Sequence, residues 1–307
     1  MIPLITLEGP TASGKSALAL ALAQELGTEI ISADSRQVYR RMDIGTAKPS
    51  ARDLEAVPHH LIDIIEPDES YNAGRFCADA THIIDGLHRR DRIPLVCGGT
   101  GLYVNALLRG LFPHISIDPS LRRQLKLRLA GEGLESLHRE LKELDPAFTA
   151  GISGNDRQRV LRGLEVFLAT GVPISEHWRR QREQSGFRAF RILIDPPRAA
   201  LYARIDARVA SMLGQGLLEE IKNLLSMGFD ASSPGLNSVG YKEFLPHLTE
   251  AVSLQDCAAL AAQHTRNYAK RQCTWYRKIK FDLTLGSDAG ILSEIAAHVR
   301  DWQLSLN

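Results

Sequence analysis

Short apolar runs alternate with helical patterns over the first hundred residues. Residues 2–8 form a short, mostly apolar run, which suits a strand buried in a parallel sheet, and residues 29–32 and 93–97 are further short segments of strand length. Residues 15–26 are rich in Ala and Leu, and residues 73–90 end in a cationic turn, as helices commonly do. Strands that alternate with helices in this way predict a parallel α/β sheet.

The pattern changes near residue 114, and from about residue 118 to 183 helical periodicity without a convincing strand replaces it. A strand is predicted again at 191–195, followed by one long helix over 198–226. We therefore expect an α/β fold in which a parallel-sheet core is interrupted by a helical insertion domain. The predicted core comprises residues 1–115 and 187–307, and the predicted insertion comprises residues 116–186.

Composition narrows the class of protein but not its function. The 307 residues include 37 basic and 36 acidic side chains, with 44% hydrophobic and 24% charged residues, which excludes disordered, collagen-like and overtly basic proteins. No secretory signal and no membrane-spanning apolar segment is recognised. The four cysteines, Cys77, Cys97, Cys257 and Cys273, lack metal or redox spacing, so a reduced, cytoplasmic protein is expected. We also expect a monomer.

The segment after the first predicted strand matches the P-loop motif GxxxxGK[ST] in full. It consists of Gly9, Pro10, Thr11, Ala12, Ser13, Gly14, Lys15 and Ser16. Its glycines allow backbone N–H groups to converge on phosphate oxygens, and the following helix N-terminus adds a positive dipole. Lys15 supplies a full charge and the Ser16 hydroxyl can hold Mg²⁺. A chance Gly-rich turn is the alternative, which the flanking strand and helix disfavour.

One feature argues against a hydrolysing NTPase or a kinase. Such enzymes carry an acidic residue at the end of an apolar strand to hold Mg²⁺ or to position water. Here the strand at 93–97 is followed by Gly98, with no acid. Asp63 and Asp195 are possible substitutes, although two prolines follow Asp195 and indicate a strand end.

Asp34 and Thr100 follow two of the predicted strands. The carboxyl ends of parallel strands border the ligand crevice, so both residues should lie near the P-loop. Asp34 could accept a proton from a substrate amine beside the leaving phosphate. It could instead cap a helix, because Gln37 three residues later completes a capping-box pattern. For Thr100 the alternative is ordinary turn chemistry.

Several clusters of cations suggest a polyanionic partner. Residues 266–280 combine six cations with three aromatic residues, as a helix that contacts nucleic acid would; a solvated face with Trp275 and Tyr276 in the core is the alternative. Gln158 and Arg162 share a helix face. Further clusters occupy 122–128 and 179–182.

A pair of arginines and a pair of histidines are two smaller features of the sequence. Arg204 and Arg208 are four residues apart on a predicted helix, where Arg208 could close over a phosphate. The adjacent His59 and His60 have no further ligands at metal spacing, so we interpret them as structural.

Together, these segments resemble bacterial tRNA dimethylallyltransferases over nearly the whole chain. The resemblance is carried by GPTASGKS, DSRQVYRRMDIGTAKP, PHHLIDI, GGTGLY, NDRQRVLRGLEV, SVGYKE and AKRQCTWYRK, in this order. It implies transfer of a dimethylallyl group from dimethylallyl diphosphate to N6 of the adenine 3′ of the anticodon (position 37), with Mg²⁺. It also implies that the insertion grips the tRNA anticodon stem-loop.

The resemblance implies roles for individual residues. Residues 9–16 and Arg208 would bind the diphosphate, and Ser16 would contact the metal. Asp34 would accept the adenine proton, with Thr100 and Lys15 as further catalytic residues. The implied tRNA contacts are Asp34, Ser35, Arg36, Gln37, Thr100, Arg122, Gln158, Arg159, Val160, Leu161, Arg162, Lys270, Arg271 and Arg277.

Three other functions stay open at this point. A small-molecule or nucleotide kinase would use ATP and transfer a phosphoryl group. A non-catalytic P-loop protein would bind tRNA without modifying it. An adenylate prenyltransferase would use free AMP or ATP, whereas the insertion and the cationic clusters favour a macromolecular acceptor.

Overall fold

The computed structural model describes residues 1–110, 115, 117–180, 186–250, 252–286 and 290–306. The chain divides into two compact units, Met1–Leu108 with Ser185–Asn307, and Arg109–Gln184. The sequence placed these divisions at 115/116 and 186/187. The first unit is an α/β domain and the second is helical over its described residues.

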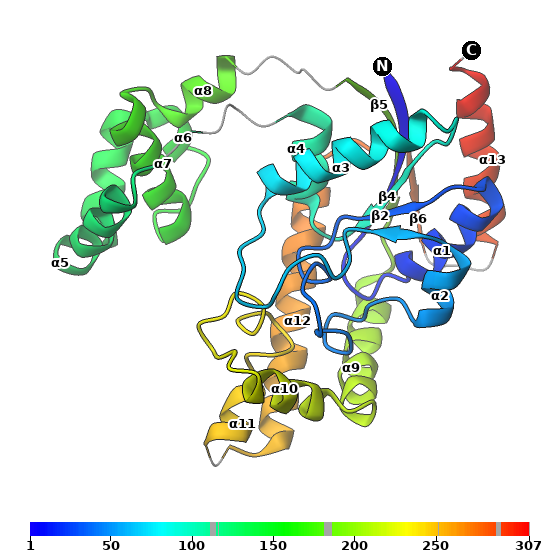
Figure 1. The fold of residues 1–307 in the computed structure, drawn as a ribbon. Coiled ribbons are helices and arrows are strands. Elements are labelled where there is room, and N and C mark those ends of the chain that lie inside the picture. The colour runs from blue at the N-terminus through cyan, green and yellow to red at the C-terminus, as the bar shows by residue number, and fades with distance from the viewer. Residues whose placement is uncertain (111–114, 116, 181–185, 251, 287–289, 307) are drawn as a thin grey trace. The chain divides into compact units, whose positions relative to one another are not determined.

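A six-stranded parallel sheet forms the centre of the first unit, in the order β3-β2-β4-β1-β5-β6 (Figure 1). The strands are β1 (Ile2–Glu8), β2 (Ile30–Ser32), β3 (His59–His60), β4 (Leu95–Gly98), β5 (Phe187–Ile194) and β6 (Leu283–Leu285). Ile5 of β1 is in register with Leu95 of β4 and with Phe190 of β5. The predicted α/β fold with a parallel sheet is therefore confirmed.

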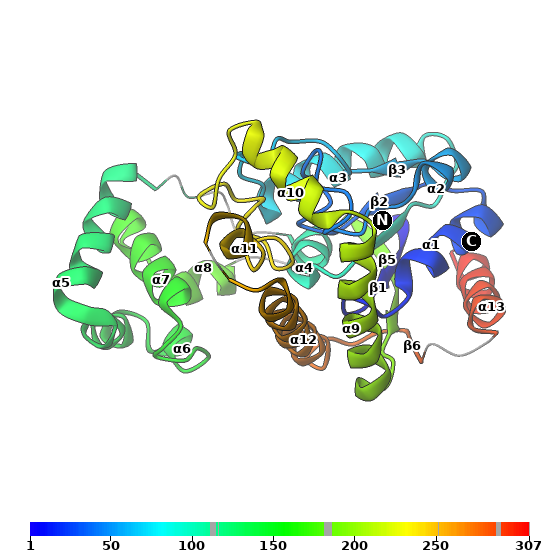
Figure 2. The same cartoon turned by 90° about the horizontal axis from the view of Figure 1, so that it is seen from below.

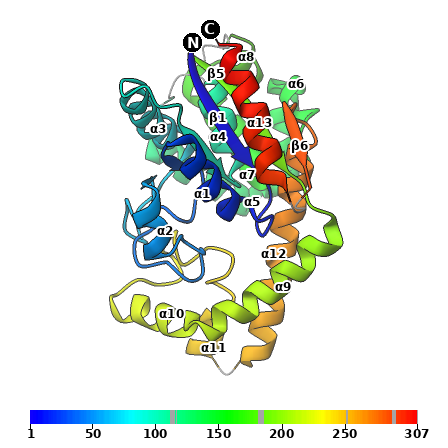
Figure 3. The ribbon, with the colours of Figure 1, turned by 90° about the vertical axis from the view of Figure 1, so that its right-hand side faces the viewer.

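Helices cover both faces of this sheet. Ile5 and Leu7 of β1 pack toward α1 and α13 on one face, whereas Leu4 packs toward α3 and α4 on the other (Figure 3). A third apolar cluster joins α9 to α12, and α9 and α12 lie side by side (Figure 2). The helices are α1 (Lys15–Leu26), α2 (Ala51–Ala56), α3 (Ala73–His88), α4 (Gly101–Arg109), α9 (Arg198–Gly214), α10 (Leu217–Ser226), α11 (Leu245–Thr249), α12 (Leu254–Tyr276) and α13 (Ile291–Leu304).

The predicted helix over 198–226 is wrong at one point, because two helices occupy this range. Gly216 separates α9 from α10 with a φ of 100°, a left-handed conformation that glycine adopts without steric cost. By contrast, α1 has the predicted bounds, and Gly27 caps its end with a φ of 60°.

The histidine pair predicted to be structural forms β3, at the edge of the sheet. His59 Nδ1 lies 2.8 Å from the carbonyl oxygen of Val57, and His60 Nε2 lies 2.6 Å from Glu29 Oε2. Burial raises the pKa of Glu29, but hydrogen bonds from His60 and Arg90 outweigh it and hold that pKa below its usual value. These contacts fasten the edge strand to the sheet.

The second unit contains helices only, over its described residues. They are α5 (Pro119–Leu144), α6 (Pro146–Thr149), α7 (Arg157–Thr170) and α8 (Ile174–Arg180). Gly133 interrupts α5 with a φ of 80°, so its two halves differ in direction. Leu141, Phe148 and Leu164 belong to a separate apolar core. Among the described helices of either unit, none combines the length and the apolar character needed to cross a bilayer.

Candidate active site

The P-loop, residues 9–16, connects β1 to α1 as the sequence predicts. A Cβ at Gly9 would lie 2.7 Å from the carbonyl oxygen of Ile194, so only glycine lets the loop pass this closely over β5. Gly14 has a φ of 92° directly before α1, which turns the backbone into the helix. The loop therefore places its amides at the carboxyl edge of the sheet and at the N-terminus of a helix.

Two cavities adjoin the P-loop. The larger has a volume of about 340 Å³, and the smaller has a volume of about 320 Å³. Lys15, Ser16, Ala47 and Arg208 line both. All lining residues come from the first unit, so this unit alone contains the candidate site.

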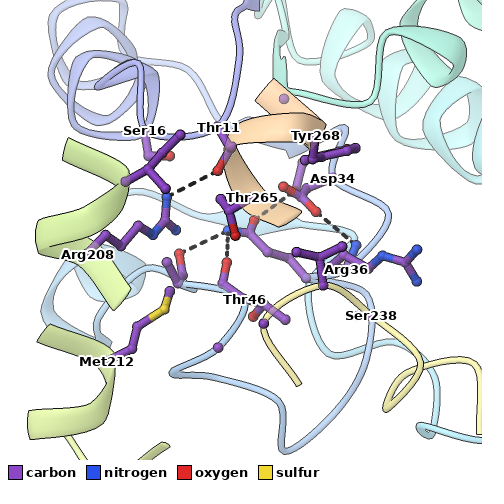
Figure 4. A pocket seen from close by; sticks show the side chains of 18 of the residues that line it. Thr11, Ser16, Asp34, Arg36, Thr46, Arg208, Met212, Ser238, Thr265 and Tyr268 are labelled. Atoms are coloured by element: carbon purple, nitrogen blue, oxygen red, sulfur yellow. Dashed lines mark hydrogen bonds between the residues drawn. The ribbon is translucent and has the colours of Figure 1, made fainter. Parts of the chain in front are cut away.

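Positive and negative groups converge in the larger cavity. Burial lowers the pKa of Lys15, while Cys97 and Asp34 raise it. Burial also lowers the pKa of Arg208, and Asp34 again opposes this effect. The Asp34 carboxylate is therefore near enough to stabilise both cations. Figure 4 shows Ser16 and Arg208 on one side of the cavity and Asp34 on the other. This arrangement confirms that the P-loop and Asp34 face one pocket.

Two arginines of α9 donate hydrogen bonds to the P-loop. Arg208 donates a long hydrogen bond to Thr11 Oγ1 (3.5 Å), and Arg204 donates to the carbonyl oxygen of Ser13 (3.3 Å). Arg208 thus contacts the P-loop, and its binding of a phosphate stays a prediction.

Asp34 does not cap a helix, because residues 35–38 form turns. Its Oδ1 accepts the N–H of Arg36 at 2.8 Å, which is an Asx turn. Gln37 makes no capping contact: its Oε1 accepts from Ser32 Oγ at 2.9 Å and its Nε2 donates to the carbonyl oxygen of Ala47 at 3.1 Å. The capping-box interpretation is therefore wrong, and one Asp34 oxygen is left to serve the pocket.

Thr100 holds the Asp34 loop in place. Its Oγ1 accepts the N–H of Ser35 at 3.0 Å. Burial and the Asp34 carboxylate raise the pKa of Tyr268 to about 12, so its hydroxyl stays protonated. Tyr268 lines the larger cavity, whereas Thr100 is beside it.

A carboxylate from α10 supports the opposite wall of the cavity. Glu220 accepts the N–H groups of Asp43 and Ile44, each at 2.8 Å, and of Gly45 at 3.3 Å. Its Oε1 also accepts the hydroxyl of the fully buried Tyr241 at 2.6 Å. The segment 43–47, which supplies Gly45 to Ala47 of the wall, is thereby fixed to α10.

The apolar part of the larger cavity was not foreseen from the sequence. Ile205, Val209 and Met212 of α9 line it together with Leu217 and Phe244. Their helical spacing was visible, but such spacing is more often a core signal than a site signal. The cavity therefore joins a charged end, beside residues 9–16, to an apolar chamber.

The predicted cationic helix is α12, and its two faces differ. Lys270, Arg271 and Arg277 are exposed, whereas Gln272 and Tyr276 are buried. The core interpretation is confirmed for Tyr276, whereas Trp275 is only half-buried. The exposed cations leave the contact with nucleic acid as a prediction.

Two predicted RNA-binding arginines of the second unit meet at one glutamate. Arg122 Nε of α5 lies 3.7 Å from Glu165 Oε1, and Arg162 Nη1 of α7 lies 3.4 Å from Glu165 Oε2. Arg159 and Gln158 are exposed at the start of α7.

The predicted contact of Val160 with RNA is wrong, because this residue is 0% exposed within the helical core. Leu161 is only partly exposed and packs against the same core. In the 179–182 cluster, Arg179 and Arg180 pair with Glu176, and residues 181 and 182 lie outside the described residues.

Comparison with known proteins identifies the relatives of this chain. A family described as IPP transferase matches residues 37–279. The chain belongs to the IPP transferase family. The chain is 47% identical to a tRNA dimethylallyltransferase of Syntrophobacter fumaroxidans over 278 residues, covering 90% of this chain and 81% of the relative. It is 44% identical to one from Roseiflexus sp. over 304 residues, covering 98% and 99%.

Solved structures resemble this chain in fold as well. The tRNA isopentenylpyrophosphate transferase of Bacillus halodurans superposes with a TM-score of 0.73 at 36% identity, covering 98% of this chain and 96% of that one. A eukaryotic dimethylallyltransferase, captured acting on tRNA, superposes with a TM-score of 0.79 at 32% identity, covering 98% and 78%. The P-loop and Asp34 precede residue 37, so the family match does not include them and their assignment depends on geometry.

Proposed function

We propose that the protein transfers a dimethylallyl group from dimethylallyl diphosphate to N6 of the adenine 3′ of the anticodon, at position 37 of tRNA. The observation that carries this proposal is that Asp34 faces Lys15 and Arg208 across one cavity. Membership of the IPP transferase family supports the reaction class, and relatives named tRNA dimethylallyltransferase support the substrate.

The diphosphate end of the donor fits the P-loop. Backbone N–H groups at the start of α1 and the side chains of Lys15 and Arg208 supply positive charge. Negative charge grows on the diphosphate as the allylic C1–O bond breaks. Groups fixed in advance around that charge lower the barrier, because they need no reorganisation during the reaction.

The donor set at the P-loop also fits Mg²⁺. No cluster of three or more His, Cys, Asp or Glu side chains that could cage a metal occurs among the described residues. Mg²⁺ keeps several waters and commonly binds substrate phosphates with only one or two protein oxygens. The Ser16 hydroxyl, which faces both cavities, would hold the ion, and the ion would neutralise diphosphate charge.

Asp34 acts on the acceptor. Adenine N6 is a poor nucleophile because its lone pair is delocalised into the ring. N6 attacks C1 of the donor, the C1–O bond breaks, diphosphate leaves, and Asp34 takes one proton from N6. The Asx turn to Arg36 and the Thr100–Ser35 bond hold the carboxylate for this transfer. The adenine must leave its stack to reach the cavity.

Cationic side chains would bind the RNA. Lys270 and Arg271 on α12, Arg277 directly after it and Arg122 in the second unit are exposed, whereas Arg162 is half-buried. All of them suit phosphate contacts. Arg36 is exposed beside Asp34 and suits a contact close to the reacting base. We further propose that one chain suffices as a monomer, since every residue lining both cavities comes from it.

The test uses purified protein, Mg²⁺, dimethylallyl diphosphate and an unmodified anticodon stem-loop RNA. Nucleosides from the digested RNA are analysed by mass spectrometry, and prenylated adenosine at position 37 is expected. Parallel reactions replace the donor with ATP, or the RNA with AMP, and no product is expected from either. Unmodified RNA in the presence of folded protein and donor would refute the proposal.

A further inference from the structure

Gln272 on the buried face of α12 contacts both sides of the candidate active site. Gln272 is only 7% exposed. Its Oε1 accepts the N–H of Thr11 at 2.9 Å, and its Nε2 donates to the carbonyl oxygen of Gly99 at 2.8 Å. Thr11 belongs to the P-loop, whereas Gly99 precedes Thr100 at the end of β4. One side chain thus bridges two loops that follow different strands.

The bridge requires an amide. Only an uncharged amide presents an acceptor and a donor from the same end of the side chain. A glutamate could accept from Thr11 but could not donate to Gly99, and a methionine could do neither. The orientation of the amide is also determined, because the reverse would place two donors and two acceptors face to face.

The contact with Gly99 is close as well as polar. A Cβ at Gly99 would lie 2.6 Å from Gln272 Nε2 and 3.5 Å from Lys15 Nζ. A Cβ at Gly101 would collide with the Trp275 indole, one turn further along α12. The turn after β4 therefore fits against α12 only with glycine at these positions, which leaves little freedom in its placement.

The bridge continues toward the candidate base. Thr100, which follows Gly99, accepts the Ser35 N–H at 3.0 Å, and Ser35 follows Asp34. A path of hydrogen bonds and two short backbone links therefore leads from Thr11 to Asp34 by way of Gln272. At the other end, the Thr11 hydroxyl accepts from Arg208 while its N–H is turned toward Gln272. The amide of Thr11 is thus withheld from the phosphate site.

We propose that Gln272 is a positioning residue that fixes the P-loop relative to the loop of Asp34, and so sets the donor carbon against the acceptor nitrogen. This inference rests on the proposed function, because it assumes that a donor at the P-loop reacts beside Asp34. Small displacements of reacting groups lower rates steeply, so the loss of the bridge should reduce turnover more than substrate binding.

The test compares Gln272→Met with Gln263→Met, a matched substitution at an exposed glutamine of the same helix. Gln272→Met should lower kcat by roughly 10- to 100-fold, with smaller changes in KM for the diphosphate donor and for the stem-loop RNA. Hydrogen exchange measured by mass spectrometry should accelerate in peptides covering both 9–16 and 98–103. Gln263→Met should match the wild type in every measurement.

Gln272→Glu keeps the acceptor for Thr11 but sets a carboxylate oxygen against the Gly99 carbonyl. It should therefore also lower kcat, so it tests the bridge if the methionine variant does not fold. A kcat within about twofold of wild type in either folded variant would overturn the proposal. Faster exchange confined to one of the two loops in Gln272→Met would overturn it too. If the wild type modifies no RNA, the proposed function fails, and the exchange measurements still decide whether Gln272 joins the loops.

Discussion

Replacing Asp34 with asparagine separates the chemistry of the carboxylate from its role in the loop. Asparagine has nearly the same volume, and its Oδ1 can still accept the Arg36 N–H that aspartate accepts at 2.8 Å. The Thr100–Ser35 hydrogen bond does not involve the substituted side chain. The loop should therefore keep its shape while it loses the group that takes the N6 proton.

The size of the effect follows from the role proposed for Asp34. A positioned general base contributes about 10²- to 10⁴-fold to a rate, which corresponds to about 3 to 5 kcal/mol of barrier. The substitution also removes a negative charge that stabilises Lys15 and Arg208 in their protonated forms. Those cations face an anionic donor, so the loss of a nearby carboxylate should not weaken donor binding. We expect a fall in kcat with little rise in the KM for dimethylallyl diphosphate.

Single-turnover reactions with excess enzyme measure the chemical step directly, and filter binding of the stem-loop RNA measures affinity. Asp68→Asn is a suitable control, because Asp68 is exposed and does not line either cavity. A single-turnover rate for Asp34→Asn within about tenfold of wild type, with RNA affinity unchanged, would show that Asp34 is not the base. A defect confined to KM would assign Asp34 to binding instead.

Three further outcomes are expected. Glu29→Gln should lower the free energy of unfolding at neutral pH, because the ionised carboxylate is the stabilising form. Urea unfolding should show that the difference between variant and wild type disappears as the pH falls through the folded-state pKa of Glu29, which lies below the usual 4.5. Gly45→Ala would force a Cβ into the Tyr241 ring, so thermal unfolding should report a loss of about 1 to 3 kcal/mol; an unchanged Tm would contradict the packing. Arg162→Ala should raise the KM for RNA several-fold with kcat unchanged. The slope of log affinity against log salt concentration should become shallower by about one unit, as expected for the loss of one phosphate contact.

The parts of the site that lie next to one another in the chain could be predicted from the sequence. The P-loop is a local motif whose strand, glycines and helix are consecutive, so its shape depends on few distant contacts. Asp34 could be placed because the carboxyl ends of parallel strands share one edge. The sequence therefore predicts which chemical groups the two loops carry, although it does not give the distance between them.

Contacts made by side chains distant in sequence could not be predicted in the same way. Gln272 and Glu220 act on backbone groups 261 and 177 residues away, and nothing in their local patterns marks them. The break at Gly216 was missed because the apolar spacing continues on both sides of it. Two-residue β3 is too short for any periodicity to reveal.

The attachment of segment 43–45 to Glu220 has a consequence for biosynthesis. Segment 43–45 leaves the ribosome early, whereas Glu220 and Tyr241, which hold it, are translated much later. Until then three backbone amides of this wall lack their acceptor. The nascent chain accordingly cannot complete this wall of the chamber until Tyr241 has been translated, although its first strands are synthesised much earlier.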